Sequence, residues 1–113
     1  MKRCVIASKN PAPLIEEYYS DYSIMVMNPN APPKRYQYLL ENSDYSLLVT
    51  DHGYQVRDDG SDYNDERAYW YTSGTTGDSK FYPFRWKQID HVARTIQEAY
   101  NLSANDRYYS IMP

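Results

Sequence analysis

Cysteine is almost absent from this chain of 113 residues. Cys4 is the only one, which excludes an internal disulfide framework and suits a reducing compartment such as the cytoplasm. No stretch approaches the roughly 20 apolar residues that a membrane-spanning helix needs, and the first residues lack the apolar centre of a signal peptide. Acidic residues outnumber basic ones, 15 to 12. This balance argues against electrostatic binding of nucleic acid or of an anionic membrane.

Phenylalanine and tryptophan are also scarce, at two residues each, whereas tyrosine occurs 14 times. Much of the core must therefore be built from rings that carry a hydroxyl group, and each buried hydroxyl needs a hydrogen-bond partner or access to the surface. A surface rich in tyrosine is also typical of interfaces. The length fits a single domain, residues 1–113, with enough chain to bury a core without disulfides.

Apolar runs and helix-like segments alternate along the first half of the chain. The runs near 3–7, 23–27 and 45–50 have the length of buried strands. Helices are predicted over 12–20 and 33–42, each with proline near its first turn. This β-α-β-α-β order is typical of parallel strands joined by right-handed crossovers. We therefore predict an α/β fold of three layers, with a mostly parallel sheet and helices on both faces.

The second half of the chain adds further strand-like and helical patterns. Strands are predicted near 67–72, 81–85 and 107–112, and a helix with one apolar stripe over 87–100. Pro83 cannot donate a backbone hydrogen bond, so its strand is expected at a sheet edge or at a bulge.

Residues 51–66 are polar and rich in turn signals, with a short hairpin through 54–56 as one option. The segment's clustered acidic residues are Asp58, Asp59, Asp62, Asp65 and Glu66. Their spacing does not fit a calcium-binding loop, because Gly60 would stand where the third ligand belongs if Asp58 were the first. A solvated loop without a metal site is the prediction.

One loop carries recognisable chemistry. Its candidate phosphate-binding residues are Thr72, Ser73, Gly74, Thr75, Thr76, Gly77 and Lys80. Glycine permits positive φ and a close approach of the backbone to a ligand, hydroxyl and amide groups together can surround an anion, and lysine adds a positive charge. The spacing does not match a Walker A loop, and the alternative is an ordinary turn.

The string from Tyr71 to Lys80 closely resembles the phosphate-loop signature of the adenylate-forming, or AMP-binding, superfamily. Acyl-CoA synthetases, adenylation domains of peptide synthetases and firefly luciferase belong to it. Their usual form is Tyr-Thr-Ser-Gly-Thr-Thr-Gly-any-Pro-Lys-Gly, and here Ser79 replaces the proline and Phe81 the final glycine. A ring at that last position is expected to crowd the backbone bend that glycine permits. Weaker similarity extends over most of residues 23–113.

The resemblance implies part of an N-terminal domain of such an enzyme, with ATP and magnesium as cofactors and the loop holding the β- and γ-phosphates. Family members are several times longer, and their adenine pocket, magnesium-binding glutamate and catalytic lysine come later in the chain. We therefore expect a fragment or a reduced relative that is not a complete catalyst alone, unless a partner chain supplies the missing domain. No catalytic role is assigned to Cys4, His52 or His91.

The alternative function is a non-catalytic module that keeps the fold and self-associates. The tyrosine content favours it, as do the faces that a shortened domain would expose. A dimer with two-fold symmetry is the favoured assembly, because this is the commonest closed arrangement of identical chains.

Overall fold

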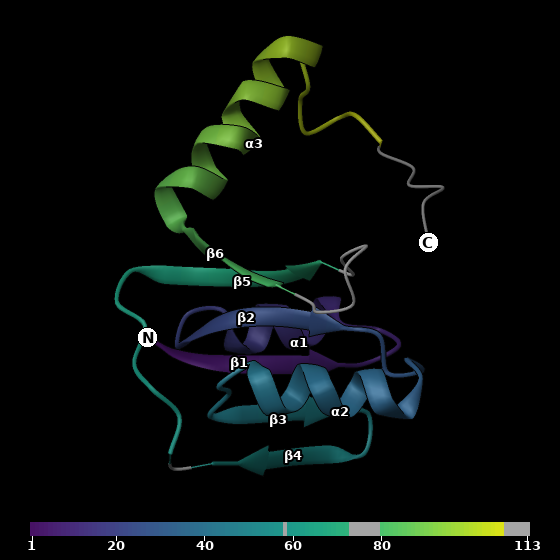
Figure 1. The fold of residues 1–113 in the computed structure, drawn as a ribbon. Helices are drawn as coiled ribbons and strands as arrows, with labels where there is room; N and C mark the ends of the chain where they lie inside the picture. Colours follow the sequence, from purple (N-terminus) through teal and green to yellow (C-terminus); the bar gives the residue numbers. More distant parts are fainter. Residues whose placement is uncertain (58, 73–79, 108–113) are drawn as a thin grey trace.

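The computed structural model describes residues 1–57, 59–72 and 80–107. The described part is a mixed α/β fold with one six-stranded sheet and three helices (Figure 1). In chain order the elements are β1 (Lys2–Ala7), α1 (Ala12–Tyr18), β2 (Tyr22–Met27), α2 (Pro33–Asn42), β3 (Leu47–Thr50), β4 (Gly53–Val56), β5 (Glu66–Thr72), β6 (Lys80–Arg85) and α3 (Trp86–Tyr100).

The strands lie side by side in the order β4-β3-β1-β2-β5-β6. The four central strands, β3, β1, β2 and β5, are parallel to one another, and the edge strands β4 and β6 are antiparallel to their neighbours. Pro83 lies in β6, as its missing donor predicts for an edge strand. The hairpin through 54–56 forms as well, as β4 paired with β3.

Alternating side chains on the central strands build two hydrophobic clusters, one on each face of the sheet. On the α2 face, Val5 and Met25 pack with Leu39 of α2, which is fully buried. On the α1 face, Cys4 and Ile24 pack with half-buried side chains of α1. In Figure 1, α2 accordingly lies in front of the sheet and α1 behind it. Helices on opposite faces are what two right-handed crossovers in opposite directions produce.

The helix α3 has a different relation to the sheet. It begins with a capping interaction in which the Gln88 side chain accepts the Arg85 N–H at 2.8 Å, and it ends at Asn101 in the left-handed conformation, φ 52°. None of its residues is buried. Figure 1 shows it rising away from the sheet beyond β6.

Two predicted segments extend two residues beyond the observed elements, and a third is almost entirely outside the described residues. The helix predicted over 12–20 ends at Tyr18, and the strand predicted over 45–50 begins at Leu47. The strand predicted over 107–112 lies outside the described residues, apart from Arg107, which is not in a strand. Among the described helices, none has both the length and the apolar character that crossing a membrane requires.

Candidate functional site

The carboxyl ends of the central strands meet at one edge of the sheet. β1, β2, β3 and β5 are parallel, so Ala7, Met27, Thr50 and Thr72 end their strands on the same side. In open α/β sheets, ligands bind beyond this edge. The candidate phosphate loop therefore starts where this architecture commonly places a ligand.

Two of the seven candidate residues lie within the described chain, and they are directly opposite each other. Thr72 is the last residue of β5, Lys80 is the first of β6, and the two are partners in the antiparallel register. Both side chains are exposed. The prediction that the loop joins two strands is therefore confirmed. The other candidates, Ser73, Gly74, Thr75, Thr76 and Gly77, lie outside the described residues.

Aromatic packing on the α2 face holds the end of the β5–β6 hairpin that lies next to the connecting segment. Tyr71 pairs with Phe81 in the register, and the Phe81 ring lies 6.3 Å from the ring of the buried Tyr69. The Arg35 guanidinium of α2 stands over the Tyr71 ring at 5.7 Å. Phe81 is thus half-buried against the core cluster, which accommodates the large ring found where the family signature has glycine.

A polar network occupies the same edge two strands away from β5, where β1 and β3 end. The Ser8 hydroxyl donates to Asp51 Oδ1 at 2.5 Å, and the Lys9 backbone N–H donates to Oδ2 at 3.1 Å. These two hydrogen bonds are the main causes that lower the pKa of Asp51. A cavity of about 300 Å³ lies between this network and Asn30. The polar groups at this edge therefore hydrogen-bond to one another and connect the loops that follow β1 and β3.

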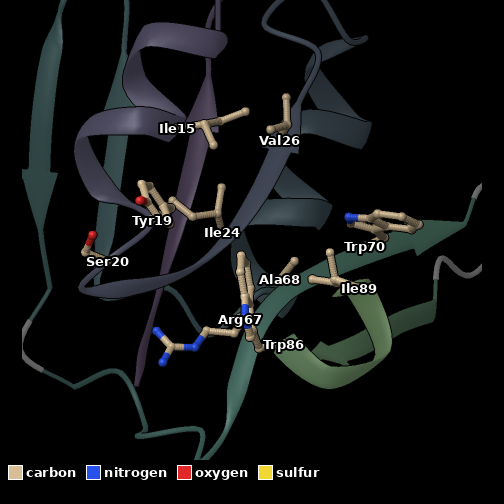
Figure 2. Close-up of a pocket in the computed structure, with 10 residues that line it drawn as sticks. All are labelled: Ile15, Tyr19, Ser20, Ile24, Val26, Arg67, Ala68, Trp70, Trp86 and Ile89. Carbon is tan, nitrogen blue, oxygen red and sulfur yellow. The ribbon is translucent and has the colours of Figure 1, made fainter. Parts of the chain in front are cut away.

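A cavity of different character lies on the α1 face (Figure 2). It is a groove of about 510 Å³, and we call it the α1-face groove. Its lining residues are Ile15, Tyr19, Ser20, Ile24, Val26, Arg67, Ala68, Trp70, Trp86 and Ile89. Arg67 is the one charged side chain in this lining, and its Nη1 lies 3.1 Å from the Met1 sulfur. The groove therefore offers apolar contact and no acid–base pair.

A buried ion pair at the opposite, amino edge corrects one prediction. Glu66 does not belong to a solvated acidic loop: it is the first residue of β5 and 4% exposed. Arg3 Nε and Nη2 donate to its two carboxylate oxygens at 2.8 and 3.0 Å, and the Ser23 hydroxyl donates to Oε1 at 2.7 Å. The Arg3 guanidinium also lies 3.7 Å from the Tyr63 ring centre.

This ion pair stabilises the fold and offers no site for a ligand. Burial alone would lower the pKa of Arg3, but the hydrogen bonds and charge of Glu66 outweigh burial and raise it. Arg3 Nη1 makes a further hydrogen bond to the Ser43 carbonyl at 3.0 Å, so both charged groups are engaged within the protein. Sequence reasoning missed the pair because each member stands at a strand end, where a charged residue is ordinarily exposed.

Comparison with known proteins adds no family name. A scan against models of protein families gave no match, and a search of curated proteins gave none.

Within residues 1–57, 59–72 and 80–107, no group of three or more His, Cys, Asp or Glu side chains is placed to hold a metal ion.

Proposed function

We propose that the segment 72–80 binds the phosphate groups of a nucleoside triphosphate, and that the chain is a reduced relative of the N-terminal domain of adenylate-forming enzymes. The observation that carries the proposal is the cross-strand pairing of Thr72 with Lys80 at the carboxyl edge of a largely parallel sheet. A hydroxyl and an ammonium group at the two ends of a loop rich in glycine and threonine suit an anionic ligand. The three-layer arrangement of that domain is part of the same proposal.

The described residues fit the phosphates better than they fit magnesium. Lys80 is exposed at the start of β6, directly after the connecting segment, where its charge can approach a β- or γ-phosphate. No carboxylate cluster for a divalent ion exists in the described part of the chain, so the nucleotide would bring magnesium on its own phosphates. The proposed activity is therefore binding and positioning of a triphosphate, without turnover by the chain alone.

The lone thiol is consistent with the cytoplasm as the place where this binding occurs. Cys4 is fully buried in β1, and burial raises the pKa of its thiol to about 12. A buried, protonated thiol neither ligates metal nor forms a disulfide on the surface, so it packs as a small apolar residue.

Titration with ATP and with pyrophosphate, followed by amide chemical shifts, tests the proposal. We expect shifts confined to residues near 72–80 and a dissociation constant in the high-micromolar to millimolar range, about −4 to −6 kcal/mol. The affinity should fall with added salt, because exposed charge supplies much of it. Lys80→Ala should weaken binding by about 1–2 kcal/mol, the contribution of one charge-assisted hydrogen bond.

A matched control separates the loop from general charge. Lys87→Ala removes another exposed lysine, from the first turn of α3, and should leave the affinity unchanged. Equal losses in the two variants would indicate nonspecific attraction. If about 10 mM of either ligand produces no shift near the loop, the phosphate-binding proposal is wrong, and self-association remains as the function.

A further inference from the structure

We propose that two copies of this chain form a symmetric dimer in which α3 of each copy lies in the α1-face groove of the other. The inference is independent of phosphate binding, because the groove lies on a face of the sheet and the loop at its edge. It rests on three features: an open apolar groove, an unpartnered apolar helix stripe, and the distribution of charge around both.

The α1-face groove exposes side chains that a sheet of this kind normally covers. Val26 is in β2, between two parallel neighbours, and is nevertheless 40% exposed. Trp70 and Trp86 are 57% and 55% exposed along the same groove. Figure 2 shows Ile15 of α1 and Tyr19, which follows α1, on one side of the groove and Trp70, Trp86 and Ile89 on the other. Apolar side chains therefore line the groove on both sides. A contiguous apolar surface of this kind marks an interaction site.

The helix α3 carries the complementary surface. Ile89, Val92 and Ile96 follow one another at spacings of three and four and so lie on one side of the helix. Val92 and Ile96 are 56% and 47% exposed, so the described chain leaves this stripe uncovered. Ile89 already lines the groove of its own chain, which places the start of the stripe at the groove's rim. The rest of α3 leads away from it (Figure 1).

Self-complementarity argues for a second copy as the occupant. One chain offers both halves of a helix-in-groove contact, and a two-fold axis lets two chains make this contact twice. Because each α3 starts beside its own groove, the exchange brings the two helices next to each other. The stripe is uncharged, and the groove contains the single charge of Arg67. The two surfaces therefore meet without burying an unpaired acidic group.

The charges on α3 argue against a membrane as the occupant. A helix that lies on anionic lipid carries mostly Lys and Arg on its polar face. Here Lys87 and Arg94 are balanced by Asp90 and Glu98, and Arg94 Nε already pairs with Asp90 at 2.9 Å. Vesicles of anionic phospholipid are accordingly expected not to bind the chain. Binding to them that Ile96→Glu abolishes would overturn the proposal in favour of a membrane surface.

Light scattering on the full chain at increasing concentration tests the dimer. We expect the mass to rise from 13.3 kDa to twice that value. Ile96→Glu in the stripe and Val26→Glu in the groove should each raise the dissociation constant at least about tenfold, as a charge in the centre of an interface does. Gln97→Glu places the same charge outside the stripe and should leave association unchanged. Trp70→Glu serves as a second groove variant if Val26→Glu fails to fold.

Mixing the two defective variants distinguishes the proposed contact from its competitors. A copy with Ile96→Glu keeps an intact groove, and a copy with Val26→Glu keeps an intact helix, so the mixture should form heterodimers more tightly than either variant forms homodimers. If the dimer instead survives Val26→Glu and mixing rescues nothing, α3 pairs with α3 and the groove proposal is wrong. A mass of 13.3 kDa at millimolar concentration overturns it outright.

Tryptophan fluorescence provides an independent readout. Both tryptophans of the chain line the groove, so dimerisation should shift their emission to shorter wavelength at the concentration where the mass doubles. A blue-shifted emission that does not depend on concentration in a monomer would show that the chain covers its own groove, which contradicts the proposal.

Discussion

The two ends of the sheet are built differently. Around β1, β2 and β3, helices cover both faces, and five of the six residues of β1 are buried. Around β5 and β6, one face packs on the core through Tyr69 and Phe81, and the other is open along the α1-face groove. α3, which follows directly, has no buried residue.

This difference separates the part of the chain that holds the fold from the part that presents surfaces. Apart from Val26 in the groove, the apolar side chains of β1, β2 and β3 pack in two clusters, one against α2 and one against α1. The β5–β6–α3 unit carries both the candidate loop and the exposed apolar stripe. Substitutions at buried positions of the first unit should therefore affect stability, and substitutions at exposed positions of the second should affect binding or association instead. Paired variants test this.

The largest expected effect is at the ion pair that joins the two units. Arg3→Met leaves Glu66 as a buried carboxylate without its cation and should lower the free energy of unfolding by about 3–5 kcal/mol. Arg94→Met breaks the exposed pair with Asp90 and should cost at most about 0.5 kcal/mol. Urea denaturation of the two variants measures both values.

A double variant sharpens this result. Adding Glu66→Met to Arg3→Met removes the unpaired charge, so stability should recover toward the original value. If Arg3→Met alone costs no more than Arg94→Met, the pair is not buried in solution, and the contrast between interior and surface ion pairs fails.

Leucine truncation should give the next largest effect. Leu39 of α2 is fully buried on the β1–β3 unit, and Leu39→Ala should cost about 2–5 kcal/mol because it removes contacts and leaves a cavity. Leu102, just after α3, is 43% exposed, and Leu102→Ala should cost less than about 1 kcal/mol. Thermal unfolding of both variants checks the ratio, and similar losses would mean that α3 is packed as tightly as α2.

The smallest effect concerns acid titration at the carboxyl edge. The hydrogen bond from Ser8 is the main cause that lowers the pKa of Asp51, so Ser8→Ala should raise that pKa. Since the folded pKa lies below the unfolded one, Asp51 stabilises the fold above the unfolded pKa, and this is lost as pH falls through the folded pKa. Carboxyl carbon shifts measured against pH follow the change. An unaltered titration in the variant would show that Ser8 does not hold Asp51.

Much of the fold could be predicted from local patterns. The apolar runs identified β1 and β2 to within a residue, and Pro83 correctly indicated an edge strand. The candidate site was predicted in part: the register of β5 with β6 confirms that Thr72 and Lys80 flank a loop between strands. The burial of Glu66 was not predicted, because Glu66 ends a polar, largely acidic segment and its buried partner, Arg3, is distant in the sequence.

By itself, the sequence determined the elements and their alternation, since strand and helix periodicity depend on residues a few positions apart. The resemblance of the 72–80 segment to a phosphate loop also comes from the sequence alone, because it is a matter of residue type and spacing. Only the tertiary structure decided that Arg3 meets Glu66, 63 positions away, and that Val92 and Ile96 of the α3 stripe stay exposed. Both depend on how distant elements pack against one another, and patterns among residues a few positions apart do not contain that information.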